Sequence, residues 1–123
     1  MKIAFIITSC LLMFACGGET VKQTKKEVPL ATEDYIERYE NTHELKITGT
    51  LKNGERDGIW TAWFKNGTVE SEAMYADGLR HGKINTWYES EKLRYTGFYA
   101  NGELFGEWIY YSPEGEELKR VKY

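Results

Sequence analysis

Hydrophobic and polar positions recur along the chain at one constant interval from residue 53 to the end (82 − 58 = 106 − 82 = 24). Glycine and tyrosine keep this interval at three sets of positions, which are Gly54, Gly78 and Gly102, then Gly58, Gly82 and Gly106, and lastly Tyr75, Tyr99 and Tyr123. Large apolar residues keep it at two more sets, Trp60, Ile84 and Trp108, and Trp63, Trp87 and Tyr111. A period in this range is typical of an array in which one supersecondary unit is stacked repeatedly.

Each repeat predicts two short β-strands joined by turns. Residues 59–65 are rich in aromatic and β-forming side chains, Asn66-Gly67 indicates a turn, residues 68–75 indicate a second strand, and residues 76–82 a longer turn. Asn-Gly and Asp-Gly steps favour hairpins, because these residues adopt positive φ at little steric cost. The sequence therefore predicts an all-β fold, a single-layer antiparallel meander of tandem hairpins, with turn glycines at Gly54, Gly58, Gly78, Gly82, Gly102 and Gly106.

Alternation along the second strand of each hairpin indicates one apolar and one polar face. Side chains two residues apart share a face, which groups Leu45, Ile47, Gly49 and Leu51, then Val69, Ser71, Ala73 and Tyr75, and then Leu93, Tyr95, Gly97 and Tyr99. One residue of each group, Gly49, Ala73 or Gly97, is small, and an aromatic ring from a neighbouring strand is expected to cover it. The candidate rings are Trp63, Trp87 and Tyr111.

Two interpretations compete for residues 32–39. A possible cap and an apolar pair at i, i+3 are compatible with a helix. A step of one period back from the array instead aligns Ile36 with Trp60 and Tyr39 with Trp63. Stacked arrays need atypical terminal repeats as caps, so we favour a degenerate first repeat over residues 32–57 and a repeat domain over residues 32–123.

The last strand predicts a protected sheet edge. It carries Lys119, Arg120 and Lys122, and charges on an edge strand discourage pairing with other chains. Leu118 comes one step late against Leu93, and the register is restored by Tyr123. One residue near residues 112–115 therefore looks inserted, which suggests either a bulge or a longer turn.

The N-terminal residues have the pattern of a secretory signal. Lys2 precedes an apolar run over residues 3–14, which is shorter than the roughly 20 apolar residues that a membrane-spanning helix needs. Residues 12–16, Leu-Met-Phe-Ala-Cys, resemble the lipobox of bacterial lipoproteins, in which the cysteine is lipidated and becomes the first residue; Met13 and Phe14 depart from the usual pattern. The alternatives are an ordinary signal peptide and lipidation at Cys10, which has too short an apolar run before it.

The lipobox resemblance implies a division of the N-terminal region into two parts. Residues 1–15 would be the signal peptide, and Cys16 would carry the lipid at the start of a flexible stalk over residues 16–31, which shows no apolar period. The residue after Cys16 is Gly17 and not an aspartate, which would favour the inner membrane. In this respect the sequence resembles lipoproteins of the outer membrane. We therefore expect a lipid-anchored protein of the cell envelope, on the periplasmic or the surface face of the outer membrane.

Charge and motif content exclude several classes of function. From Lys46 onward the basic and acidic residues nearly cancel (11 − 12 = −1), whereas a nucleic-acid binder normally shows a basic face. His43 and His81 are the only histidines of the chain, and neither has a metal-type companion at i+2 or i+4. No nucleophile elbow or phosphate loop is present. The sequence predicts a protein without catalytic activity, metal or cofactor.

The aromatic content favours a binding surface. From Lys46 onward there are four tryptophans, seven tyrosines and three phenylalanines, too many for a thin sheet to hide, and aromatic residues dominate interface cores. The candidates for binding or packing are Trp60, Trp63, Trp87, Trp108 and Tyr111.

Residues 58–67 and 106–115 are similar to the MORN repeat variant, in which a glycine and a tryptophan two residues later precede a second aromatic residue and a turn glycine. The middle copy departs from this pattern at Ile84 and Glu91. The resemblance implies an elongated hairpin array used as a scaffold or as a lipid- or protein-binding surface. Bacterial relatives are labelled toxin–antitoxin system antitoxins of the YwqK family.

Three hypotheses for function follow from these observations. The first is a membrane-anchored, non-enzymatic scaffold that binds a partner protein in the cell envelope. The second is a module that binds an envelope lipid or glycan, since flat aromatic rows also stack on sugar rings. The third is an antitoxin or immunity-like protein that neutralises a toxin.

Overall fold

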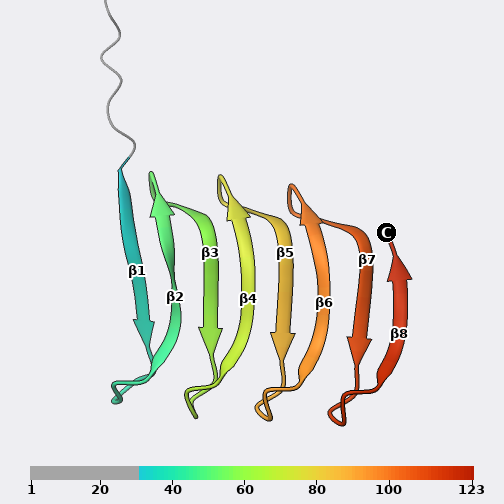
Figure 1. Cartoon of the computed structure of the whole chain (residues 1–123). Coiled ribbons are helices and arrows are strands. Elements are labelled where there is room, and N and C mark those ends of the chain that lie inside the picture. The colour runs from blue at the N-terminus through green and yellow to red at the C-terminus, as the bar shows by residue number, and fades with distance from the viewer. Residues whose placement is uncertain (1–30) are drawn as a thin grey trace, which may run out of the picture.

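The computed structural model describes residues 31–123, which form one sheet of eight antiparallel strands in chain order. The strands are β1 (Thr32–Arg38), β2 (Leu45–Lys52), β3 (Glu55–Trp63), β4 (Val69–Ala76), β5 (Leu79–Trp87), β6 (Leu93–Ala100), β7 (Glu103–Tyr111) and β8 (Glu117–Lys122). They lie side by side in a single open layer with β1 and β8 at the two edges (Figure 1). The predicted all-β, single-layer meander is confirmed. The predicted signal peptide, Cys16 and the stalk up to residue 30 lie outside the described residues.

Two kinds of turn alternate along the sheet. The first kind has two residues, Asn53-Gly54, Asp77-Gly78 or Asn101-Gly102, and both residues have positive φ, as in Asn53 (53°) and Gly54 (81°), which short hairpin turns of this kind require. The second kind has five residues, as over residues 64–68, where the N–H of Phe64 donates to the carbonyl of Thr68 at 2.8 Å. The predicted long turn over residues 76–82 is therefore wrong, because strand β5 already begins at Leu79.

Gly58, Gly82 and Gly106 lie inside strands and not in turns, although their φ values are positive at 70°, 105° and 67°. Each one sits where the register shifts. On β7, for example, residues 106–108 lie opposite the single residue Gly97 of β6. These glycines form β-bulges, in which the positive φ lets the strand accommodate extra residues.

A second bulge lies near the start of every even-numbered strand. Ala62 pairs with Ser71 and Trp63 pairs with Val69, which leaves Glu70 unpaired. The predicted alternation breaks at this point, because directly paired residues of two strands share a face and Val69 therefore lies against Trp63 and not beside Ala73. The equivalent unpaired residues on the other strands are Lys46, Arg94 and Leu118.

Residues 32–38 form strand β1 and not a helix, as the degenerate-repeat interpretation requires. Its phase, however, is one residue away from the predicted one, because Tyr35 and not Ile36 lies opposite Gly49. The loop after β1 compensates for this shift. It is closed by the N–H of Tyr39 and the carbonyl of Glu44, which are five residues apart (44 − 39 = 5), whereas the equivalent pair Phe64 and Thr68 is four apart (68 − 64 = 4).

The irregularity predicted near the last turn is a bulge and not a longer turn. The N–H of Ser112 donates to the carbonyl of Glu116, the same four-residue spacing as in the loops after β3 and β5 (116 − 112 = 4). Glu117 takes the place of Leu93, since it pairs with Tyr111 as Leu93 pairs with Trp87. Leu118 is the bulged residue, and 65% of it is exposed.

Strand β8 is an edge strand, and one of its three basic residues is part of an ion-pair cluster. Arg120 contacts Glu107 of β7 at 2.8 Å and Glu117 of its own strand at 2.9 Å. These groups are about half exposed, so the cluster contributes little stability. It does keep charge on the outermost strand, which is compatible with the protective role predicted for this edge.

The core is a row of large side chains on one face, which we call the tryptophan face. Trp60, Ile84 and Trp108 on strands β3, β5 and β7 are only 4%, 4% and 3% exposed. An added Cβ at Gly49 would lie 2.3 Å from the Trp60 ring, and one at Gly97 would lie 2.2 Å from the Trp108 ring. Rings do cover the two glycines, but they are Trp60 and Trp108, and the predicted candidates Trp63, Trp87 and Tyr111 do not take this role.

The close approach of Trp108 to the backbone makes Gly97 sensitive to substitution. We expect Gly97→Ala to destabilise the sheet by about 1–3 kcal/mol, because an overpacked core forces neighbouring groups to shift. The matched variant Ala73→Gly, at the equivalent position under Ile84, should cost only about 0.5–1 kcal/mol from backbone entropy. Chemical denaturation measures both values. A Gly97→Ala protein as stable as the wild type would contradict the packing described above.

Candidate binding surfaces

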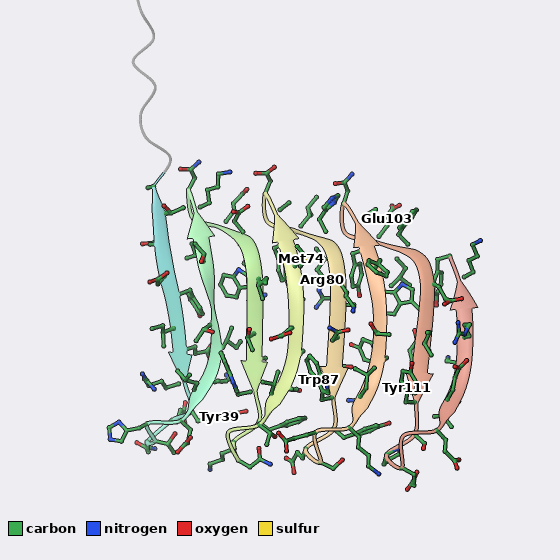
Figure 2. The ribbon with its side chains drawn as sticks, in the orientation of Figure 1. Tyr39, Met74, Arg80, Trp87, Glu103 and Tyr111 are labelled. Carbon is green, nitrogen blue, oxygen red and sulfur yellow. The ribbon has the colours of Figure 1, made fainter. Side chains whose placement is uncertain are left out.

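The five aromatic residues proposed from the sequence divide between the two faces of the sheet. Trp60 and Trp108 are packing residues of the tryptophan face. Trp63, Trp87 and Tyr111 lie an odd number of residues further along the same strands, so they point to the other face, which we call the opposite face. All three are half-buried. Trp87 and Tyr111 lie at the ends of β5 and β7 beside the five-residue loops (Figure 2).

Aromatic neighbours bury the two tryptophans of the tryptophan face without a second layer. The Trp60 ring lies 5.1 Å from Tyr35, and the Trp108 ring lies 5.1 Å from Tyr99, measured between ring centroids. Each indole N–H also donates to the carbonyl of the residue after the covered glycine, from Trp60 to Thr50 and from Trp108 to Phe98, both at 3.1 Å. The buried indoles are therefore satisfied and fixed in place.

Apolar side chains are exposed in a row on the opposite face, which we call the exposed row. Ile59 of β3 pairs with Met74 of β4, and Phe98 of β6 pairs with Phe105 of β7. Lys83 of β5 lies between these pairs, directly opposite Phe98. The exposed fractions are 61% for Ile59, 43% for Met74, 44% for Phe98 and 60% for Phe105. Two exposed apolar pairs on four strands, with a single lysine between them, are typical of an interaction surface.

The tryptophan face contains a shallow hollow of about 220 Å³. Its floor and walls are formed by the small residues Ala62, Ser71, Ala73 and Thr86 and by the larger Trp60, Ile84 and Tyr95. Arg56 and Arg80 border one end, and Glu70 and Arg94 border the other. The hollow lies where the repeat has Ala73 and Ile84 in place of a glycine and a tryptophan.

Arg56 and Arg80 are held in a ladder with two tyrosines at the end of the hollow. The Tyr75 hydroxyl accepts hydrogen bonds from Nη1 of Arg56 at 3.2 Å and from Nε of Arg80 at 3.3 Å, and the Tyr99 hydroxyl accepts one from Nη1 of Arg80 at 3.3 Å. The Arg56 guanidinium also lies 4.2 Å from the centroid of the Trp60 ring. Figure 2 shows Arg80 near the end of β5 where the two-residue turns lie.

The two guanidiniums perturb the hydroxyl that they share. Partial burial raises the pKa of Tyr75, but the hydrogen bonds from Arg80 and Arg56 outweigh burial and lower the pKa overall. The hydrogen bonds hold the two guanidiniums beside the Tyr75 hydroxyl, and no carboxylate of the described residues forms an ion pair with either arginine.

The described residues contain no cluster of metal-binding side chains. His81 accepts a hydrogen bond at Nδ1 from the N–H of Asn101 at 3.3 Å, which gives it a structural contact at the turn. In the part of the chain that the structure covers, no helix has the length and apolar character needed to cross a membrane.

Two features of these surfaces were missed in the sequence. The exposed row does not follow the repeat, because the positions one and two periods after Ile59 are Lys83 and Glu107 (83 − 59 = 107 − 83 = 24). Arg56 and Arg80 do keep the interval (80 − 56 = 24) before Leu104 replaces the arginine. An arginine repeated in phase with a tyrosine was a signal that could have been followed.

The geometry is that of a tandem β-hairpin repeat protein, and comparison with known families agrees. The profile of the MORN repeat variant matches residues 56–77 and 80–101. Each match begins in an odd-numbered strand and ends just after the next strand. The chain therefore carries adjacent repeats of the MORN variant family. No curated protein and no solved structure matches the chain significantly.

Proposed function

We propose that this protein is a non-enzymatic, lipid-anchored scaffold of the cell envelope that binds a partner protein on its repeat sheet. The MORN-type array supports the coarser part of this statement, a repeat-based binding scaffold. The exposed row supports the finer part, because Ile59, Met74, Phe98 and Phe105 are between 43% and 61% exposed. Protein interfaces bury such apolar and aromatic side chains at their centre.

The chemistry of the array favours binding over catalysis. The side-chain hydrogen bonds of the tryptophan face join arginine to tyrosine, join Lys46 to Glu37 or bind the backbone, an arrangement that fixes a surface. The ion-paired groups of the described residues are between 35% and 49% exposed, so they do not hold a carboxylate in the apolar setting that general acid–base catalysis needs. Recognition by shape and apolar contact is what these residues support best.

Substitution within the exposed row tests partner binding. The full chain with a C-terminal affinity tag is expressed in the cells that naturally produce it, purified from detergent-solubilised envelope, and its co-purifying proteins are identified by mass spectrometry. We expect one or two proteins with the wild type and their loss with the double variant Phe98→Ser and Phe105→Ser, since centrally buried aromatic residues contribute most of the binding energy.

A matched control separates recognition from general stickiness. Leu118→Ser removes an apolar side chain of similar exposure outside the row, and it should retain the same proteins. The β-sheet circular dichroism of all variants should be unchanged. Equal capture by the double variant, or loss of the partner in the control, would contradict binding through the exposed row.

The lipid anchor is tested at Cys16. A Cys16→Ser chain should not incorporate a labelled fatty acid, whereas the wild type should, because the substitution removes the thiol that would carry the lipid. A Cys10→Ser chain serves as the control and should be labelled like the wild type. Labelling of Cys16→Ser would show that the anchor is not this cysteine.

A further inference from the structure

We infer that the hollow on the tryptophan face is a binding site for a carboxylate-bearing, partly apolar segment of a protein, held by Arg56 and Arg80. The inference is independent of the exposed row, which lies on the opposite face. Its failure would leave the proposed scaffold function intact, and the two are measured with different variants.

The arginine pair is positioned but not saturated. Arg56 donates one hydrogen bond and Arg80 donates two, all to tyrosine hydroxyls. Most N–H groups of both guanidiniums are therefore left without a partner among the described residues. The tyrosine ladder and the Trp60 ring fix the planes of the guanidiniums, which lowers the entropy cost when an anion binds.

No carboxylate of the described chain neutralises these arginines. Neither Arg56 nor Arg80 takes part in the ion pairs of residues 31–123. Glu37 lies on the same face but is paired with Lys46, whose Nζ is 2.6 Å from its carboxylate. That hydrogen bond is the main cause of the lowered pKa of Glu37, and Arg56 makes only a minor contribution. Two adjacent positive charges at the rim of a hollow, without an anionic partner in the described chain, attract an anion from another molecule.

The rest of the hollow indicates what must accompany the anion. Next to the arginines the lining is apolar at Trp60, Ala73 and Ile84. A volume of about 220 Å³ leaves room for a group the size of an aliphatic side chain. Ser71 and Thr86 add hydroxyls on the floor. A glutamate or aspartate close to an aliphatic residue on one extended segment would satisfy both parts.

Two observations favour a carboxylate-bearing protein segment over a surface of phosphate groups such as an anionic membrane. The planar fork of an arginine matches the two oxygens of a carboxylate as well as it matches a phosphate. A membrane of anionic lipids, however, requires a broad basic surface, whereas the array carries a net charge of −1 from Lys46 onward (11 − 12 = −1). Glu70 and Arg94 offset each other at the other end of the hollow, so its excess positive charge lies at the arginine pair. A protein segment that places a carboxylate at this one end needs no broad basic surface.

The test is a side-chain NMR titration of the full chain in mild detergent, followed at the Nε–H signals of arginine. The probe is a capped hexapeptide, Glu-Glu-Leu-Leu-Glu-Glu, in which each side of the extended chain presents a leucine flanked by glutamates. We expect saturable shifts of the Arg56 and Arg80 signals that weaken with salt. The double variant Arg56→Gln and Arg80→Gln should bind the peptide about tenfold or more weakly, because charged hydrogen bonds are lost.

Two further variants separate the effect of the arginine pair from the effect of charge alone. Arg120→Gln removes one positive charge on the opposite face, where Arg120 contacts Glu107, and it should bind like the wild type. Arg80→Lys keeps the charge and the aliphatic stem but loses the planar fork, so it should bind more weakly although the sheet remains folded.

Four results would overturn the inference. One is equal binding of the glutamine counterpart of the peptide, which would mean simple apolar adsorption. A second is equal weakening by Arg120→Gln, which would mean unspecific charge attraction. A third is arginine-dependent binding of inorganic phosphate or of phosphatidylglycerol vesicles without binding of the peptide. The last is no shift of either arginine signal with the peptide at millimolar concentration.

Discussion

The packing of a tryptophan ring flat against the backbone of a glycine on the neighbouring strand is the interaction on which the rest of this structure depends. Trp60 covers Gly49 and Trp108 covers Gly97, at distances that leave no room for a Cβ. A single-layer sheet has no second layer to bury its apolar face. The rings supply that cover from within the layer, and the indole hydrogen bonds to Thr50 and Phe98 hold them there.

The same interaction determines which surfaces are left for binding. It buries the largest side chains of the tryptophan face, so most exposed apolar residues of strands β3 to β7 lie on the opposite face; Leu104, paired with Tyr99, is the exception. Where the repeat has Ala73 and Ile84 instead of glycine and tryptophan, the smaller pair leaves a hollow beside the arginine ladder. The departures from the repeat thus coincide with the candidate sites, as expected where function competes with ideal packing.

The constant period of the sequence was sufficient to predict the fold, because one hairpin per repeat and short turns allow only an antiparallel meander. It was not sufficient for the faces. Glycines at positive φ serve both turns and bulges, so Gly58 and Gly82 gave the same signal as Gly54 although they lie inside strands. The bulges also change which residues of neighbouring strands lie opposite each other. For this reason the ring that covers Gly49 is Trp60 and not Trp63. The exposed row lacks a period altogether, so only the three-dimensional register could reveal it.

The central claim is tested most directly by proton NMR of the two covered glycines. If the rings lie flat on the backbone, the Hα protons of Gly49 and Gly97 show nuclear Overhauser effects to the indole rings of Trp60 and Trp108 and resonate at unusually high field. Gly54, whose surroundings are open, gives an ordinary shift in the same spectrum. Ordinary Hα shifts at Gly49 and Gly97, without contacts to an indole, would contradict the account.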